Sequence, residues 1–358
     1  MSGMWGNKLK LSIWGESHGE AIGIVVDGLP SGIVLDMQAI EKEMARRAPN
    51  GGEFSTQRKE ADKVEILSGF FDGHTTGTPL CAMIRNSNTR SADYGKTKDL
   101  PRPSHSDYGY YVQSNGNNDF RGGGHSSGRI TAPLVFAGAI CKQLLRERGI
   151  EICSHLLNVG NVRDTRFGVD IPQELTKRLQ DMALPLIDSG KEKEIAQVVA
   201  DARKQGDSVG GGIEVAICGV SAGVGQPFFN SIESTLAGLL FSVPAVKGIE
   251  FGNGFAMTEM FGSQANDQFC LQDGKIKTIT NNNGGVCGGI ANGMPIVFNV
   301  AIKPTPSIYK EQQSVNLATM QEEKLTIEGR HDPCIVVRAL PVIESVAAIA
   351  IYELLDKD

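Results

Sequence analysis

The chain has 358 residues, and its 41% hydrophobic and 21% charged residues are an ordinary globular balance, so it can bury a sizeable core. A net charge of −6 and an aromatic content of 6% argue against a nucleic-acid-binding surface, which needs a basic footprint and stacking platforms. The sequence has no run of 18 apolar residues and no apolar leader, so we expect a cytoplasmic protein without a membrane span.

In chain order, the first hundred residues predict four short strands and one helix. The strands are expected at residues 9–13, 21–26, 64–67 and 80–84. Asp36 is expected to cap the helix, because Leu35 and Ile40 are spaced as a hydrophobic staple. Arg46 and Arg47 lie in its last turn, where cations are often only partners of the helix dipole.

A polar cluster follows the first strand. Gly15 and Gly19 bracket Glu16, Ser17 and His18. Loops at strand ends often carry binding and catalytic side chains. The alternative, a plain turn with a solvated histidine, is weaker here because all three enclosed side chains are chemically useful.

Segments 102–107 and 121–129 together hold three arginines, two histidines and four glycines. Glycines let backbone N–H groups approach a ligand closely, and a helix beginning near Ser126 and Ser127 would direct further N–H groups to an anion. Flanking arginines would complete a cage for a ligand with several negative charges. A glycine-rich solvated loop is the alternative, and this stretch by itself does not decide between the two.

The rest of the chain mixes helices and strands without a regular alternation. Helices are expected at residues 127–148, 173–183, 191–204, 231–242 and 341–355. Strands are expected at residues 212–220, 246–251 and 296–302, and through Arg338, which we expect to lie apart from other polar clusters. Several strands in succession before a helix favour an α+β fold with antiparallel sheets. No internal repeat or clean linker is present, so we expect one domain over residues 1–358.

Five loops are enriched in arginine, histidine, aspartate, serine or glycine, and they lie around His18, Arg47 and residues 105–129, 284–307 and 330–332. If they converge, arginines could hold phosphate and carboxylate groups while histidines transfer protons. The glycine loops lack Walker and Rossmann spacing, and the seven cysteines lack zinc spacing, so we expect free thiols and no metal site. We interpret His74 and His155 as surface or structural residues. The residues alone thus indicate a polyanion-binding enzyme with imidazole acid/base groups.

Six motifs occur in order along the chain: Gly15-Glu16-Ser17-His18-Gly19, Arg102-Pro103-Ser104-His105-Ser106-Asp107, Arg121-Gly122-Gly123-Gly124 with Ser127-Gly128-Arg129, Ala245-Val246-Lys247-Gly248-Ile249-Glu250, Lys303-Pro304-Thr305, and Gly329-Arg330-His331-Asp332-Pro333-Cys334. Together they resemble the motifs of the chorismate synthase family. The match runs in the family's order from about Trp14 to the last helix. Six long motifs in one order are very specific.

The resemblance implies a cytoplasmic, homotetrameric lyase with a β-α-β sandwich of helices between antiparallel sheets. Such an enzyme converts 5-enolpyruvylshikimate 3-phosphate to chorismate and phosphate by 1,4-elimination, the last step of the shikimate route to aromatic amino acids. It requires reduced FMN without net redox change, and NADPH is a candidate reductant. The hydrogen lost from C6 is not acidic and the leaving phosphate is allylic, so transient electron donation from the flavin would help to expel it.

The same resemblance implies roles for individual residues. His18 would protonate the departing phosphate, His105 the reduced flavin, and Asp332 would assist proton removal. The arginines expected to hold phosphate, carboxylates or flavin are Arg47, Arg102, Arg129 and Arg330. The residues expected to contact the flavin are His125, Ser126, Ser127, Ala245, Gly288, Lys303, Pro304, Thr305, Pro306, Ser307 and Arg330.

Three positions depart from the commonest family pattern. Ala48 replaces the third arginine of an Arg-Arg-Arg-Pro run, Glu53 stands where an arginine is frequent, and His125 replaces an arginine beside the flavin serines. The first two leave open how many arginines hold the substrate and whether a nicotinamide cofactor binds there. An NAD(P)H-dependent flavin reductase and an RNA binder are the competing classes, and no dinucleotide fingerprint supports the first. The sequence leaves open whether the protein reduces its own flavin.

Overall fold

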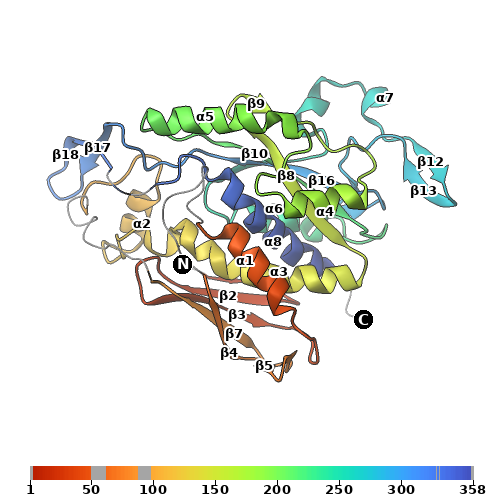
Figure 1. Ribbon diagram of the computed structural model, residues 1–358, viewed down its shortest axis with the longest axis horizontal. Helices are drawn as coiled ribbons and strands as arrows, with labels where there is room; N and C mark the ends of the chain where they lie inside the picture. Colours follow the sequence, from red (N-terminus) through yellow and green to blue (C-terminus); the bar gives the residue numbers. More distant parts are fainter. Residues whose placement is uncertain (1–2, 50–61, 88–97, 328, 330, 356–358) are drawn as a thin grey trace. The chain divides into compact units, whose positions relative to one another are not determined.

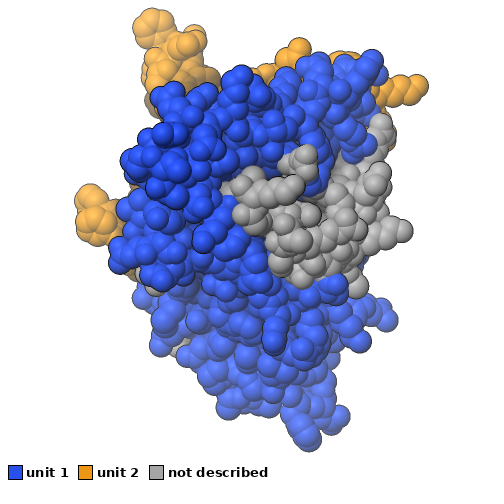
Figure 2. Space-filling view, turned by 90° about the vertical axis from the view of Figure 1, so that its left-hand side faces the viewer, with its two compact units in different colours: residues 1–137, 196–209, 304–338 blue, residues 138–195, 210–303, 339–358 orange. Residues whose placement is uncertain are grey.

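The structure is a computed structural model that describes residues 3–49, 62–87, 98–327, 329 and 331–355. Contacts divide the chain into two compact units (Figure 2). Unit 1 comprises residues 1–137, 196–209 and 304–338, and unit 2 comprises residues 138–195, 210–303 and 339–358. Helices α3 (Thr131–Glu147), α5 (Glu192–Lys204) and α8 (Val336–Leu354) contribute residues to both units. That the whole chain forms one domain stays a prediction.

Unit 1 is built on a five-stranded antiparallel sheet with the order β1-β2-β3-β7-β4 (Figure 1). The strands are β1 (Met4–Trp5), β2 (Lys10–Gly15), β3 (Ala21–Asp27), β4 (Val64–Ser68) and β7 (Leu80–Arg85). The four strands predicted in this region are confirmed within two residues at each end. Alternate residues of β3, namely Ile22, Ile24 and Val26, are buried on one face of the sheet.

The register of this sheet gathers two loops at one end. Gly15 at the end of β2 is paired with Ile22, and Arg85 at the end of β7 is paired with Ala21. The loops that follow β2 and β7 therefore leave the sheet beside the start of β3. This is where Asn86, which follows β7, contacts the loop that carries His18.

Short elements complete unit 1. Helix α1 (Met37–Arg47) begins as predicted, since Asp36 Oδ1 accepts a hydrogen bond from the Ala39 N–H at 3.0 Å. The remaining elements are α2 (Asp107–Gln113), the 3₁₀ turns η2 (Gly124–Ser126) and η3 (Gly128–Ile130), and the hairpins β5 (Phe70–Phe71) with β6 (His74–Thr75) and β17 (Gln312–Asn316) with β18 (Gln321–Leu325).

The helix predicted at residues 127–148 begins later than expected. Ser127 has extended backbone (φ −66°, ψ 145°), so η2 and η3 precede the α-helix, which starts at Thr131. The Ser127 hydroxyl accepts a hydrogen bond from the Arg129 N–H at 3.3 Å, which supports the separate turn η3. Pro133 then falls in the first turn of α3, where its missing N–H costs no helical hydrogen bond.

Unit 2 is built on a second antiparallel sheet with the order β11-β16-β10-β8-β9. Its strands are β8 (Glu151–Val159), β9 (Val162–Arg163), β10 (Gly211–Cys218), β11 (Val246–Phe251) and β16 (Ile296–Ile302). One face carries an apolar cluster of Cys153, Ala216 and Val297 with Leu179 of α4 (Gln173–Asp181). The other elements are η4 (Ser189–Lys191), η5 (Phe228–Asn230), α6 (Ile232–Leu240), η6 (Gly254–Glu259), α7 (Gly262–Ala265), β12 (Phe269–Gln272), β13 (Lys275–Thr278), β14 (Val286–Cys287) and β15 (Ile290–Ala291).

The prediction of a strand through Arg338 is wrong. Helix α8 begins at Val336, and Pro341, which was expected to open the last helix, lies inside it. The residue before a proline is biased away from helix, but burial of Val336, Leu340 and Val342 outweighs this bias. The Ser345 hydroxyl donates to the Pro341 carbonyl at 2.6 Å.

All seven cysteines lie in the described part of the chain and are free thiols, as predicted. Within residues 3–49, 62–87, 98–327, 329 and 331–355, no helix is long and apolar enough to cross a membrane. The same residues contain no group of three or more histidine, cysteine, aspartate or glutamate side chains that could hold a metal ion.

Unit 2 contains a buried histidine between two carboxylates. His155 is fully buried, with Nδ1 3.0 Å from Asp164 Oδ2 and Nε2 2.9 Å from Glu214 Oε2. Burial lowers the pKa of His155, but the hydrogen bonds and charges of Asp164 and Glu214 outweigh burial and raise it. Glu214 also accepts from Arg166 Nε at 3.0 Å, and the Phe167 ring lies edge-on to the imidazole. His155 is therefore a structural residue.

We expect His155→Gln to destabilise the fold by about 3–5 kcal/mol at about pH 6, because it removes one partner of a buried ion cluster. A histidine whose pKa is raised on folding contributes stability below its unfolded pKa, and this contribution is lost as the pH rises through its folded pKa. The difference between wild type and variant should therefore be largest below the unfolded pKa of about 6.5 and shrink as the pH rises above it. Urea unfolding at several pH values measures this, with His74→Gln as an exposed control. A difference that grows with pH would contradict the ionised cluster.

Candidate active site

The loop after β2 holds His18 in a buried position in unit 1. Gly15 ends the strand with a φ of +95°, a left-handed value that favours glycine. The side-chain amide of Asn86, which follows β7, donates to the Glu16 carbonyl at 3.0 Å and to the Gly19 carbonyl at 2.9 Å. His18 is 8% exposed. The end of β7 thus fixes the loop that presents the histidine.

Ser17 anchors one nitrogen of this imidazole. The Ser17 hydroxyl donates to the Arg121 carbonyl at 3.3 Å, and the same oxygen lies 3.2 Å from His18 Nδ1. A hydroxyl has only one proton to donate, and Ser17 donates it to the Arg121 carbonyl. In the contact with His18, Ser17 Oγ must therefore accept, and we assign a proton to His18 Nδ1. His18 is thereby tied to the segment that begins at Arg121.

Two adjacent glycines bring both predicted catalytic histidines to one segment. A Cβ atom at Gly122 would lie 2.2 Å from His18 Cε1, and a Cβ at Gly123 would lie 3.0 Å from His105 Cε1. Both glycines have positive φ, at +62° and +101°. Only glycine permits this approach. The structure therefore places His18 and His105 against neighbouring residues of the same backbone.

His105 belongs to a charged cluster with Arg102 and Asp107. Its Nδ1 lies 2.6 Å from Asp107 Oδ1, while Arg102 donates to Asp107 through Nε at 2.7 Å and Nη2 at 2.8 Å. Burial raises the pKa of Asp107, but hydrogen bonds from Arg102 and His105 outweigh it and hold that pKa well below its usual range. An ionised carboxylate only accepts, so we assign a proton to His105 Nδ1. Asp107 thereby orients the ring and fixes its tautomer.

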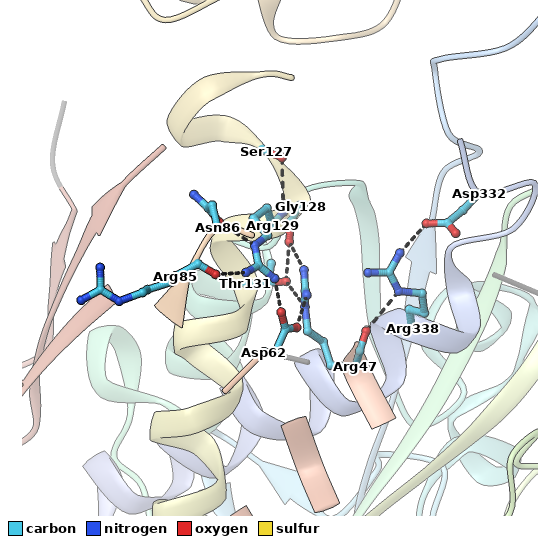
Figure 3. A network of polar contacts seen from close by, with 10 residues as sticks. All are labelled: Arg47, Asp62, Arg85, Asn86, Ser127, Gly128, Arg129, Thr131, Asp332 and Arg338. Atoms are coloured by element: carbon cyan, nitrogen blue, oxygen red, sulfur yellow. Dashed lines mark hydrogen bonds and ion pairs between the residues drawn. The ribbon is translucent and has the colours of Figure 1, made fainter. Parts of the chain in front are cut away.

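A second arginine cluster lies at the start of α3 (Figure 3). Asp62 bridges two guanidinium groups, with Oδ2 2.8 Å from Arg47 Nη1 and Oδ1 hydrogen-bonded to Arg129 Nη1. Arg47 also donates to the Gly128 carbonyl at 2.9 Å. Arg129 donates through Nε to Asn86 Oδ1 at 3.0 Å. The cluster therefore connects α1, the end of β7 and η3.

Burial and neighbouring charges both shift the pKa values of the residues in this cluster. Burial, and then the charge of Arg338, lower the pKa of Arg47 to about 10. Burial raises the pKa of Asp62, but the charges of Arg47 and Arg129 outweigh it, so that pKa is lowered. Asp62 is therefore ionised at neutral pH and is the counter-ion of both arginines.

Asp332 and Arg338 extend the cluster. Arg338 Nη1 lies 2.5 Å from Asp332 Oδ2, and Arg338 Nε donates to the Arg47 carbonyl at 3.1 Å (Figure 3). The expectation that Arg338 lies apart from polar clusters is wrong, because α8 begins early enough to turn this side chain toward Asp332. Arg338 thus joins the last helix to the C-terminal end of α1.

The predicted serines lie on the same segment as the two glycines. Ser126 donates to the Gly123 carbonyl at 2.7 Å, and its Oγ lies 2.6 Å from Ser106 Oγ. His125 Nδ1 lies 2.7 Å from the Gly15 carbonyl, so this ring is tied to the end of β2. Because a carbonyl only accepts, the proton of the His125 ring lies on Nδ1. Only the Nε2 edge of the ring is then left to bind a ligand.

The remaining predicted residues fall in three places. Pro304, Thr305, Pro306 and Ser307 belong to unit 1, where Arg102 Nη1 lies 3.4 Å from Ser307 Oγ. Ala245, Gly288 and Lys303 belong to unit 2, where Lys303 N–H donates to the Ala245 carbonyl at 3.0 Å. Ala245 has a φ of +75°, and burial followed by the charge of Lys247 lowers the pKa of Lys303. Arg330 and Glu53 lie outside the described residues.

Sequence reasoning gave no role to three residues that organise the site. Asp107 could have been found from its spacing to Arg102 and His105, because a carboxylate two residues after a histidine in a turn can reach its ring. Asn86 and Asp62 lie in no motif, and their partners are distant in sequence. Only the folded chain shows that they contact the site.

The chain is similar to known proteins along nearly its whole length. The profile of the family described as chorismate synthase matches residues 9–355. Curated relatives named chorismate synthase include one from Methanosarcina mazei, 44% identical over 97% of this chain and 94% of the relative, and one from Thermococcus kodakarensis, 45% identical over 98% and 96%. A solved structure titled as the crystal structure of chorismate synthase covers 98% of this chain and 92% of its own, with a TM-score of 0.76 and 28% identity. The predicted α+β fold class is confirmed.

The assigned tautomer of His105 is testable by NMR. We expect neutral His105 to carry its proton on Nδ1, and Asp107→Asn to weaken this bias because a neutral amide oxygen is a weaker acceptor than a carboxylate and the amide NH2 can donate to the ring instead. Long-range proton–nitrogen spectra of protein labelled in its histidine nitrogens report the tautomer, with His105→Gln assigning the signal. Asp207→Asn, which removes a surface partner of Lys310 in the same unit, is the control. An Nε2-protonated ring in the wild type would contradict the assignment.

Proposed function

This chain belongs to the chorismate synthase family and is therefore a lyase, and we propose that it converts 5-enolpyruvylshikimate 3-phosphate to chorismate and phosphate by 1,4-elimination. The observation that carries the proposal is the contact of two histidines with the adjacent Gly122 and Gly123. The same segment continues into Arg129 and its cluster of arginines. Two proton carriers beside cations suit a substrate with one phosphate and two carboxylates.

Four arginines are proposed to hold the anionic groups. Arg102 is oriented by Asp107, and Arg47 and Arg129 are oriented by Asp62. Fixed guanidinium groups bind phosphate and carboxylate with little loss of side-chain entropy. Arg330 is included on the family resemblance alone.

Reduced FMN is the proposed cofactor, and groups of unit 1 fit it. Thr305 Oγ1 is buried and has no hydrogen-bond partner among the described residues, as expected of an atom that a ligand would satisfy. Ser126 and Ser127, which are also proposed to contact the flavin, lie in η2 and between η2 and η3 in the same unit. When bound, reduced FMN supplies transient electron donation that helps to expel an allylic phosphate without net redox change. His125, Pro304, Pro306, Ser307, Ala245, Gly288 and Lys303 are further proposed contacts.

The histidines and Asp332 are proposed to move protons. His18, anchored at Nδ1 by Ser17, gives a proton to the phosphate oxygen as it departs. His105, anchored at Nδ1 by Asp107, holds a proton toward the flavin. Asp332, held by Arg338, assists removal of the substrate proton. Each group is held by a neighbour, which is how catalytic acids and bases are kept in position.

The proposed function is tested by an anaerobic assay that follows phosphate release and flavin absorbance together. We expect activity with reduced FMN, none with oxidised FMN, and an undepleted pool of reduced flavin after many turnovers, because substrate and products are at the same oxidation level. One reduced flavin consumed per phosphate would support a flavin reductase instead. Repeating the assay with oxidised FMN and NADPH decides whether the chain reduces its own flavin.

We expect His18→Ala and His105→Ala each to lower turnover by roughly 10²–10⁴-fold, the usual contribution of a general acid or base. Reduced FMN is supplied in the assay, and circular dichroism checks that the variants fold. The exposed His74 provides a control, since His74→Ala should keep wild-type turnover. Near-normal turnover in either active-site variant would rule out the role proposed for that histidine.

We also propose that the protein is a cytoplasmic homotetramer. The supporting observation is a set of large apolar side chains on unit 2 that are strongly exposed in the single chain, among them Phe229 at 93%, Phe228 at 84% and Leu271 at 80%. Exposed apolar side chains in such number mark interaction surfaces. Analytical ultracentrifugation should give four times the mass of the chain, and Leu271→Asp should shift the distribution to smaller species. A monomer at micromolar concentration would contradict the proposal.

A further inference from the structure

Asp62 is a buried carboxylate that no sequence motif identifies and that two active-site arginines share (Figure 3). Its side chain is fully buried, and those of Arg47 and Arg129 are 5% and 8% exposed. Its backbone has a φ of +44°, the left-handed region, which aspartate tolerates better than most residues. The surrounding structure therefore holds Asp62 in one defined place.

One arm of the cluster runs through Arg47 to the beginning of α3. Arg47 donates through Nη2 to the Gly128 carbonyl at 2.9 Å and through Nε to Thr131 Oγ1 at 3.4 Å. Thr131 Oγ1 itself donates to the Gly128 carbonyl at 2.6 Å. Arg47 thus fastens η3, which directly continues the segment whose Gly122 and Gly123 contact the two histidines.

The other arm runs through Arg129 to the His18 loop. Arg129 donates through Nε to Asn86 Oδ1 at 3.0 Å and through Nη2 to the Arg85 carbonyl at 3.4 Å. The amide nitrogen of Asn86 donates in turn to the carbonyls on both sides of His18, at Glu16 and Gly19. The Asp62 carboxylate is therefore connected through Arg47 to the turn that continues the Gly122–Gly123 segment, and through Arg129 to the loop that carries His18.

We propose that Asp62 is a positioning residue for the reaction, whose carboxylate, shared by Arg47 and Arg129, aligns the His18 loop with the segment that carries Gly122 and Gly123. This rests on the proposed function, because it concerns the same reaction. Without the carboxylate, two buried guanidinium groups repel each other and lose a common acceptor. A displacement of about 1 Å in an active site can lower the rate by roughly 10²-fold.

The test uses Asp62→Asn and Asp62→Ala in the anaerobic phosphate-release assay with reduced FMN. We expect kcat/KM to fall by roughly 10²-fold in both variants. In Asp62→Ala, added formate should restore activity in part and saturably, because it returns a carboxylate to the space between the arginines. Formamide, which has the same size without the charge, should not restore it. Sodium chloride at equal concentration, the wild type and Asp207→Ala, a surface variant of unit 1, are the controls.

Two outcomes would overturn the proposal. One is a kcat/KM in Asp62→Asn equal to that of the wild type. The other is a loss of activity that is no larger than the loss of folded protein measured by circular dichroism, with no recovery in formate. In that case Asp62 would serve stability alone. An inactive wild type would instead defeat the proposed function, so the two failures are distinguishable.

Discussion

A cationic side chain taken out of water needs an anion within hydrogen-bond distance, because its lost hydration costs several kcal/mol that only a well-placed partner offsets. Both units of this protein are built around that requirement. Among the described residues, several buried or half-buried cations contact a carboxylate, in the pairs Arg47 and Arg129 with Asp62, Arg102 with Asp107, Arg338 with Asp332, His155 with Asp164 and Glu214, and Lys142 with Glu344. In unit 1 these pairs also orient the groups proposed to act on substrate, so one interaction serves stability and preorganisation.

A second requirement, close approach of backbone, decides where the histidines can lie. Gly122 and Gly123 leave room for two imidazole rings that any side chain would displace. A glycine also permits close packing in unit 2, where a Cβ at Gly138 of α3 would lie 2.2 Å from the Cβ of Ser345 in α8. Nearby on the same helices, Lys142 and Glu344 form a buried ion pair at 2.5 Å. Small residues thus bring charged groups into reach of one another.

The antiparallel register of the unit 1 sheet links these two requirements. It places the ends of β2 and β7 on either side of the start of β3, so that the His18 loop and Asn86 meet. Asn86 then connects that loop to Arg129, and through it to Asp62. The His18 loop of the candidate site is therefore positioned at one end of the sheet, and a sheet is a scaffold that can hold the groups proposed to be catalytic in place.

Sequence alone determined the features that depend on neighbouring residues: four of the five strands of the unit 1 sheet, the Asp36 cap, the two histidine loops, the glycine segment and, through six ordered motifs, the family. It placed the start of α8 wrongly, because the local bias of Pro341 was outweighed by burial that only the folded chain shows. It did not identify Asp62 or Asn86, or the partner of Arg338. Asp62 meets Arg129 across 67 positions and Asn86 meets the same side chain across 43. Charge pairing has no periodicity along a chain, so tertiary structure alone decided which carboxylate meets which arginine.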